Sequence, residues 1–319
     1  MLRAMPLFLA SLVHLLAATA PAQPPPSSVP ATPPAAAAAS SVVPGPPTDS
    51  SGSEKKADRR LRWPDERPRF RIVEYVASGV VGGAAIWMYF GLRPQAQPHW
   101  IGGILFDDAV RNTLRLRTAA AQQTAWAFSD AVDVGLVVLV FGLDSLALPI
   151  LRGSPDVALQ LGLMDAEAYA FSSVVAIGLY DSVGRARPSY EDCQHDPSFA
   201  GCRISPTASF PSGHTNEAFT AAGVSCANHG FLPIYGSRVW DALACARDLF
   251  LATSDGVLRI MGDRHYATDV LTGGAIGFGF GYGMPTLLHY TAHKSSFLAT
   301  LTVSPLAGHQ AGLAVSGLF

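Results

Sequence analysis

The stretch RIMGDRHYATD (Arg259–Asp269) connects two long predicted helices in this chain of 319 residues. The helix before it is predicted over Arg238–Val257, and the helix after it over Thr268–Leu288. In the second helix, three glycines recur every four residues and leave a smooth face for close helix packing. These glycines are Gly273, Gly277 and Gly281. The stretch therefore lies next to a closely packed helix and itself contains a group of charged side chains.

The composition narrows the class of protein. Hydrophobic residues make up 49% of the chain and charged residues 14%, and the mean hydropathy is +0.25. The charged fraction is far below the roughly 25% of ordinary soluble domains. This predicts a membrane protein, or else a soluble helical protein with an unusually large core. The net charge of −2 provides no basic field and argues against a nucleic-acid partner.

Four further long helices are predicted, so the fold class is all-α: a membrane-embedded bundle of about six core helices. Runs of about 20 apolar residues suffice to cross a bilayer. Charges inside a predicted helix, such as Asp241 and Arg247, are costly against lipid and must face the protein interior or water. An amphipathic surface helix is predicted over Asp107–Phe128. The four further helices are predicted over Ile72–Leu92, Ala131–Leu151, Asp156–Tyr180 and His214–Leu232.

The two ends of the chain differ from this helical domain, which is predicted over residues 72–290. Residues 1–22 have the pattern of a signal peptide or of a retained signal anchor. Residues 23–71 are rich in Pro, Ala and Ser and then basic, which predicts a disordered linker. Residues 291–319 form a tail with weak alternation, and a short hairpin is predicted around Gly308.

Within the opening stretch, His265 and Asp269 are four residues apart, which places them on one face of a helix if the helix extends that far. An aspartate bonded to one ring nitrogen fixes the tautomer and leaves the other nitrogen free as a nucleophile. The alternative is an ordinary hydrogen bond on a helix surface. Arg259, just upstream, favours the chemical interpretation because arginine binds phosphate.

Two upstream stretches supply matching chemistry. Ser212 and Gly213 stand at a predicted helix start, where a hydroxyl and exposed amides bind anions, and His214 can donate a proton. The alternative role of Ser212 is simply to cap the helix. Arg185 and Arg187 precede them and match phosphate oxygens as two-pronged donors.

Together these residues resemble the three-part signature of the type 2 phosphatidic acid phosphatase and vanadium haloperoxidase superfamily. Five residues separate Arg259 from His265, and three separate His265 from Asp269, as in that family. The resemblance implies a helical bundle whose site lies at one end. It implies a phosphatase that needs no metal or other cofactor, with His265 as nucleophile, Asp269 as its orienting group and His214 as general acid. The phosphate would be bound by Arg187, Ser212, Gly213 and Arg259.

Two positions depart from the family pattern. The family's lysine, seven residues before its first arginine, falls at Tyr180, and the serine before its second arginine falls at Leu258. We expect Arg185 to supply the missing charge. Two other functions stay open: a vanadate-dependent haloperoxidase, and a phospholipid-binding or transport protein that has lost turnover. The expected partners are a phosphorylated lipid or small phosphoester and a membrane; the oligomeric state is unknown.

The expected location is the inner membrane of a bacterial-type cell, with the site facing the periplasm. With six spans, an N-terminus inside the cell places the site on the outer face, and the basic flank before residue 72 supports that orientation. A cleaved signal peptide instead favours a periplasmic protein attached to the membrane surface. Both cysteine pairs bear on this choice, because disulfides form in oxidising compartments. Cys193 and Cys202 form a loop disulfide or remain thiols, and Cys226 and Cys245 pair or only pack.

Overall fold

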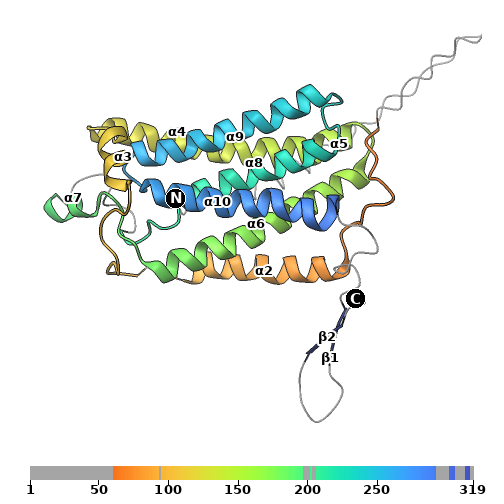
Figure 1. The fold of residues 1–319 in the computed structure, drawn as a ribbon, viewed down its shortest axis with the longest axis horizontal. Helices are drawn as coiled ribbons and strands as arrows, with labels where there is room; N and C mark the ends of the chain where they lie inside the picture. Colours follow the sequence, from red (N-terminus) through yellow and green to blue (C-terminus); the bar gives the residue numbers. More distant parts are fainter. Residues whose placement is uncertain are drawn as a thin grey trace, which may run out of the picture. The chain divides into compact units, whose positions relative to one another are not determined.

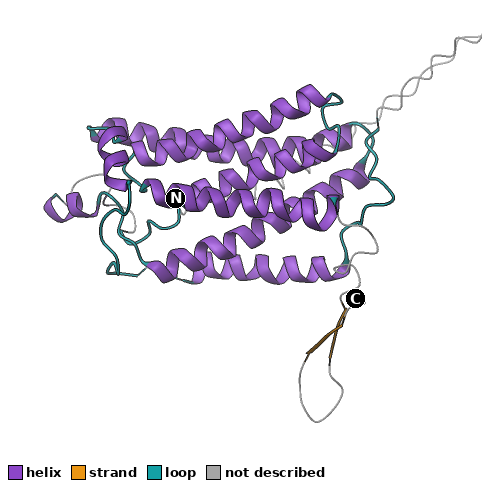
Figure 2. Cartoon of the chain, in the orientation of Figure 1, coloured by secondary structure: helices purple, strands orange, loops and turns teal. Residues whose placement is uncertain are grey.

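The computed structural model describes residues 60–92, 95–196, 202 and 206–291, together with the backbone of 302–305 and 313–316. The predicted signal segment 1–22 and most of the predicted linker lie outside the described residues. Helices dominate what is described (Figure 2). The only strands among the described residues are β1 (Thr302–Pro305) and β2 (Leu313–Ser316), which pair antiparallel at the place of the expected hairpin.

Six long helical segments form the bundle, as predicted (Figure 1). Two short helices lie at one end of it, α3 (Asp107–Leu114) and α7 (Tyr190–His195). The long segments are α2 (Ile72–Gly91), α4 (Ala119–Val137) continued by η1 (Val138–Ala147) and α5 (Leu148–Leu151), α6 (Pro155–Val183), α8 (Gly213–Phe231), α9 (Arg238–Met261), and α10 (Ala267–Met284) continued by η3 (Pro285–Tyr290).

The prediction of one amphipathic helix over Asp107–Phe128 is wrong. The chain leaves the helical conformation at Arg115, and the amide of Leu116 donates to the carbonyl of Met261 at 3.0 Å. A new helix then begins, because the hydroxyl of Thr118 caps it by accepting from the amide of Ala121. The second half of the predicted surface helix thus becomes the first part of a long core helix.

The predicted glycine face packs backbone against backbone on α8. A Cβ atom added to Gly273, Gly277 or Gly281 would lie 2.2–2.4 Å from a carbonyl oxygen of that helix. No side chain fits in this space, so the seam between α8 and α10 depends on glycine. The carbonyls that face these glycines belong to Ser212, Asn216 and Thr220 in the same order.

We expect Gly277→Ala to destabilise the protein by about 1–3 kcal/mol, because the new methyl group forces the two helices apart. Gly279→Ala is the matched control: a Cβ there meets nothing within 4 Å, and alanine favours a helix over glycine. Thermal unfolding of both variants in detergent measures the difference. Equal stability of the two variants would contradict the close packing.

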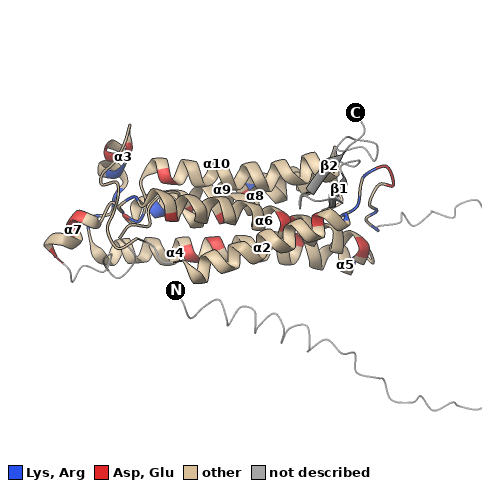
Figure 3. Ribbon diagram, turned by 90° about the horizontal axis from the view of Figure 1, so that it is seen from below, with Lys and Arg blue, Asp and Glu red and all other residues tan. Residues whose placement is uncertain are grey.

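Three helical segments are long and apolar enough to cross a membrane: Ile72–Gly91, Ala119–Leu151 and Pro155–Val183. The first exposes large apolar side chains such as Val80 (68%) and Trp87 (64%), as expected for a helix that faces lipid. The described Arg residues lie mainly at the two ends of the bundle (Figure 3).

Asp241 and Asp248 inside α9 face the protein interior, as predicted, whereas Arg247 is 36% exposed. Asp241 is buried and accepts from His229 at 2.7 Å, and Asp248 is buried and accepts from Ser225 at 2.6 Å. Arg247 pairs with Asp248 at 2.7 Å. These pairings let a helix with several charges sit inside the bundle while its outer face remains apolar.

The linker prediction does not hold for residues 60–71. Leu61 and Trp63 are buried in a core cluster with Leu161 and Ile234, because aromatic and aliphatic side chains interrupt the basic run. Arg69 pairs with Asp156 at 3.1 Å, at the start of α6. This arginine-rich segment therefore lies at the end of the bundle where α6 begins.

Candidate active site

Four helix ends bring the three sequence stretches together at one end of the bundle (Figure 1). Arg187 follows the end of α6, and His214 lies in the first turn of α8. Arg259 lies in the last turn of α9, and His265 in the turn before α10. Antiparallel helices place these ends side by side, so residues 78 positions apart in sequence, Arg187 and His265, come within hydrogen-bonding distance.

The ring of His265 is buried and held in one tautomer. Its Nδ1–H donates to the backbone carbonyl of Ser209 at 2.7 Å, so the lone pair is on Nε2. That Nε2 atom lies 3.2 Å from Nη1 of Arg187. A histidine with an unprotonated Nε2 next to an arginine is arranged to attack a bound anion.

Asp269 lies behind this histidine rather than in direct contact with it. Its carboxylate is 3.9 Å from Nδ1 of His265, and it accepts from the hydroxyl of Ser209 at 2.6 Å and the amide of Tyr266 at 2.8 Å. The two residues do not share a helical face, because Asp269 caps α10 from its third position and the helix begins only at Ala267. Asp269 thus holds the Ser209 segment that orients the imidazole.

The structure does not bring Arg185 to Arg187. Arg185 has no exposed surface, and its charge is neutralised by Asp107 at 2.7 Å and Asp269 at 2.6 Å. Its guanidinium group also lies between the rings of Trp100 and Tyr266. Arg185 is therefore a core arginine that supports Asp269, and it leaves the missing lysine charge unreplaced.

Ser212 caps α8, as its alternative role required. Its hydroxyl accepts from the amide of Thr215 at 3.5 Å, and its own amide donates to the carbonyl of Asp269 at 3.0 Å. Gly213 is exposed in the first turn, with open space around its Cα, where helix amides have no helical partner. The start of α8 thus offers backbone donors next to the nucleophile.

Sequence reasoning missed Asp130 on α4. Its carboxylate lies 3.2 Å from Nε2 of His214 and also pairs with Arg259. This aspartate positions the candidate acid and one candidate phosphate ligand at once. No local pattern marks it, because its partners are 84 and 129 residues away in the chain.

Three arginines surround the nucleophile. Burial lowers the pKa of Arg187 to about 10, with Arg259 adding to the shift. Burial also lowers the pKa of Arg264 to about 9, with Arg187 and Arg259 adding to it. Arg187 and Arg264 therefore stay protonated near neutral pH. The site is therefore electropositive and suited to an anion.

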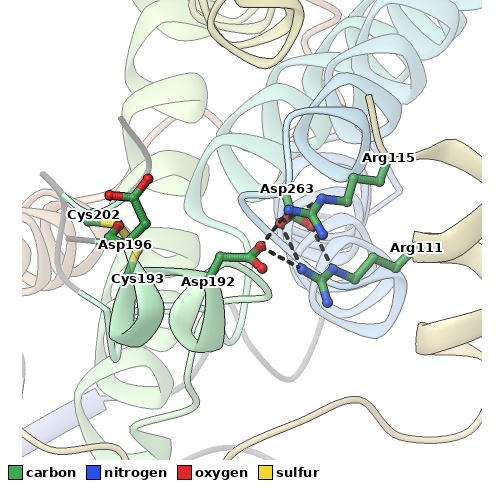
Figure 4. The surroundings of a disulfide bond; sticks show 7 residues. All are labelled: Arg111, Arg115, Asp192, Cys193, Asp196, Cys202 and Asp263. Carbon is green, nitrogen blue, oxygen red and sulfur yellow. Dashed lines mark hydrogen bonds and ion pairs between the residues drawn. A yellow bond between two sulfur atoms is a disulfide. The ribbon is translucent and has the colours of Figure 1, made fainter. Parts of the chain in front are cut away.

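Helix α3 holds the turn that carries His265 (Figure 4). Asp263 is a non-glycine residue at φ 58°, and its buried carboxylate accepts from Arg111 at 2.7 Å and pairs with Arg115 at 3.2 Å. Both arginines also pair with Asp192 in α7. The neighbouring Cys193 is bonded to Cys202, and Cys226 is bonded to Cys245, so of the two alternatives left open for each pair the disulfide is the one observed.

We expect Asp263→Asn to destabilise the protein by about 3 kcal/mol, because it removes the buried partner of two arginines. Asparagine tolerates the left-handed backbone, so the loss reports the charge. Asp192→Asn is the control, since this carboxylate is 41% exposed and binds the same arginines; there we expect less than about 1 kcal/mol. Thermal unfolding checks both, and equal losses would refute the burial argument.

The titration of His265 gives a pH dependence of stability. Burial lowers its pKa well below 6.5, and Arg187 and Arg259 lower it further. The unfolded chain takes up a proton near pH 6.5 while the folded chain does not, so stability falls as pH drops below that value. The expected slope is about 1.4 kcal/mol per pH unit. His265→Gln should reduce the loss of stability between pH 7 and 5.5. An unchanged slope would mean that another group causes the loss.

Comparison with known proteins bears on this geometry. Residues 161–292 match the family model described as the PAP2 superfamily. The match covers α6 to α10, and with them the arginines, histidines and Asp269 described above, which confirms the resemblance seen in the motifs.

Two other comparisons add less information about the chain. Among curated protein sequences, none matches it. One similar solved structure is the crystal structure of a transmembrane PAP2-type phosphatidylglycerolphosphate phosphatase from Bacillus subtilis. It is 16% identical, with a TM-score of 0.43, and the match covers 67% of this chain and 92% of that one.

Proposed function

We propose that this PAP2 protein is a metal-independent phosphatase that hydrolyses a phosphomonoester or diphosphate through a phosphohistidine. The observation that carries the proposal is the pairing at His265. Its Nδ1–H is fixed on the carbonyl of Ser209, and its Nε2 lies beside Arg187. A ring held in this way keeps its nucleophilic nitrogen in place without needing a general base.

The proposed reaction has two steps. Nε2 of His265 attacks the phosphorus atom, and the bond to the leaving oxygen breaks as His214 donates a proton to it. Water then attacks the phosphohistidine, His214 takes a proton from that water, and inorganic phosphate leaves. Arg187, Arg259 and the first amides of α8 bind the non-bridging oxygens, where negative charge is greatest.

The proposed substrate is lipid-linked, because the site lies at one end of a bundle with helices that can cross a membrane. The proposed orientation places the site outside the cytoplasm. The arginine-rich segment 60–71 lies near the start of α6 and the site beyond its end, and cytoplasmic flanks are rich in arginine. The disulfide at Cys193 lies on the site's end and supports an oxidising side. We propose the periplasmic face of a bacterial-type inner membrane.

The test is a substrate panel with the protein purified in detergent. Phosphate release is measured from phosphatidate, an isoprenyl diphosphate and a soluble aryl phosphate, for the wild type and His265→Ala. Release from at least one lipid substrate that requires His265 supports the proposal. Equal release by the two proteins would sink it.

The same samples separate the other candidate functions. Binding of inorganic phosphate without hydrolysis of any substrate would favour a phospholipid-binding or transport protein. Halide oxidation that depends on added vanadate would favour a haloperoxidase, because the same pocket binds the larger oxyanion.

A further inference from the structure

We propose that Arg264 is a third phosphate-binding cation in this pocket, and that it replaces the lysine for which the chain has Tyr180. This inference rests on the proposed function and deepens it. It also assigns a preference: a terminal phosphate with three free oxygens over a phosphodiester. Nothing in the three-part signature assigns a role to this position.

The guanidinium group of Arg264 is held in one place. Its central carbon lies 3.6 Å from the centroid of the Trp126 ring, a cation–π contact. The indole is fixed in turn, because its Nε1–H donates to the carbonyl of Gly262 at 2.6 Å. The Trp126 ring on α4 is thus hydrogen-bonded to the same turn that carries Arg264 and His265.

Two of its donors have nothing to bind. Nε and Nη1 of Arg264 are shielded from solvent and have no hydrogen-bond partner among the described residues. Leaving a buried charged donor unsatisfied is unfavourable, so the arrangement favours a ligand with acceptor oxygens. Arg185 shows the contrast: its terminal nitrogens bond to Asp107 and Asp269, as a structural arginine requires.

Its neighbours place Arg264 in the anion site. The carbonyl of Arg264 accepts from Nη1 of Arg187 at 2.9 Å, and the same Nη1 lies beside Nε2 of His265. Its amide donates to the carbonyl of Arg259 at 3.0 Å. The mutual repulsion of these three arginines is part of what lowers the pKa of Arg264. A bound phosphate relieves that repulsion.

The charge balance favours a highly charged ligand. Arg187, Arg259 and Arg264 repel one another, and Asp130 and Asp255 both pair with Arg259. A bound anion relieves this repulsion. A phosphomonoester carries about −1.5 to −2 and three terminal oxygens, whereas a diester carries one charge and two such oxygens. The third cation therefore benefits the monoester more.

Tyr180 explains why the pocket needs a cation from another element of the fold. Its phenol bonds to Arg187 and brings no positive charge, whereas the family's lysine at this position would bring one. Arg264 approaches the same phosphate from the α9–α10 turn instead. The pocket thus keeps the number of cations and changes the element that supplies one of them.

The experiment compares the purified wild type with Arg264→Gln. Inorganic phosphate is the probe: its binding is measured by calorimetry and by its inhibition of aryl phosphate hydrolysis. We expect phosphate affinity to fall about tenfold, as for the loss of one charged, two-pronged donor. The monoester-to-diester ratio of kcat/KM should fall as well. The control is Arg238→Gln, which removes the same charge about 30 Å away at the other end of α9; it should bind phosphate as the wild type does.

Moving the positive charge from position 264 to position 180 provides the decisive variant. In the Arg264→Gln background, Tyr180→Lys should recover most of the lost phosphate affinity, which a merely structural role of Arg264 would not permit. If Arg264→Gln fails to fold, Tyr180→Lys alone still decides, because a pocket that already has three cations should gain less than about threefold.

Three results would overturn the inference: unchanged phosphate binding in Arg264→Gln, no recovery in the double variant, or a gain above about threefold from Tyr180→Lys alone. Failure of the proposed function looks different. There the wild type itself neither hydrolyses a phosphoester nor binds phosphate, whereas failure of the inference leaves an active wild type with an equally active Arg264→Gln variant.

Discussion

Replacing His265 with alanine should lower phosphate release by a factor on the order of 10³ or more, the largest loss expected from any single substitution in this protein. The reason is that Nε2 forms the bond to phosphorus in the proposed first step, and no neighbouring group can take its place. The loss should appear in kcat, because Arg187 and Arg259 still bind the phosphate. Phosphate release under saturating substrate measures it.

The intermediate gives a second measure of the same role. Wild-type protein quenched during turnover of a ³²P-labelled substrate should carry acid-labile phosphate on one histidine, and His265→Ala should carry none. Ser209→Ala is a matched control: it removes a hydroxyl that bonds to Asp269 but keeps the carbonyl that holds the imidazole. It should lower turnover moderately and still form the intermediate. Labelled phosphate on His265→Ala would refute the assignment.

Replacing His214 with glutamine should have the second largest effect, about 10²–10⁴-fold on an alkyl phosphate. Alkoxide is a poor leaving group and needs a proton as it departs. Burial lowers the pKa of His214 to about 4, although the bond to Asp130 opposes this shift. A bound phosphate adds negative charge beside the ring and so favours the protonated form. His214 becomes an acid when the substrate arrives.

The leaving group distinguishes this role from a structural one. An aryl phosphate with a nitrophenol leaving group departs without help, so the same variant should lose much less activity on it. Asp130→Asn should reproduce the pattern more weakly, because Asp130 pairs with His214 and Arg259 alike. Equal losses on alkyl and aryl substrates would exclude a role as general acid.

The features that the sequence predicted correctly depend on residues that are close together in the chain. The apolar runs predicted six long helices, and the four-residue repeat of glycine predicted a closely packed helix face, which the structure places against α8. The motif spacing predicted which ends of helices carry the site. Two errors arose where a tertiary contact decides the conformation: Arg115 leaves the helix to reach Asp263, and Asp269 caps α10 so that His265 stays outside it.

The partners of the site could not be predicted in this way. Asp130 is 84 residues from His214, and only the packing of α4 against the other helices brings them together. Arg264 directly precedes His265 in the sequence. Its proposed role in binding phosphate, however, depends on the ring of Trp126, 138 residues upstream. Arg185 shows the opposite case. It has the right residue type two positions from Arg187, but the backbone turns its side chain into the core.

The glycine seam between α8 and α10 also has a consequence for dynamics. At its end the amide of Ser212 bonds to the carbonyl of Asp269, and Gly273 lies against the carbonyl of Ser212. The proposed acid, His214 on α8, and the proposed nucleophile, His265 before α10, are thus spaced by two main chains in contact, not by adjustable side chains. Their separation should stay constant through the catalytic cycle. Any opening that admits a lipid head group must then come from outside this pair of helices.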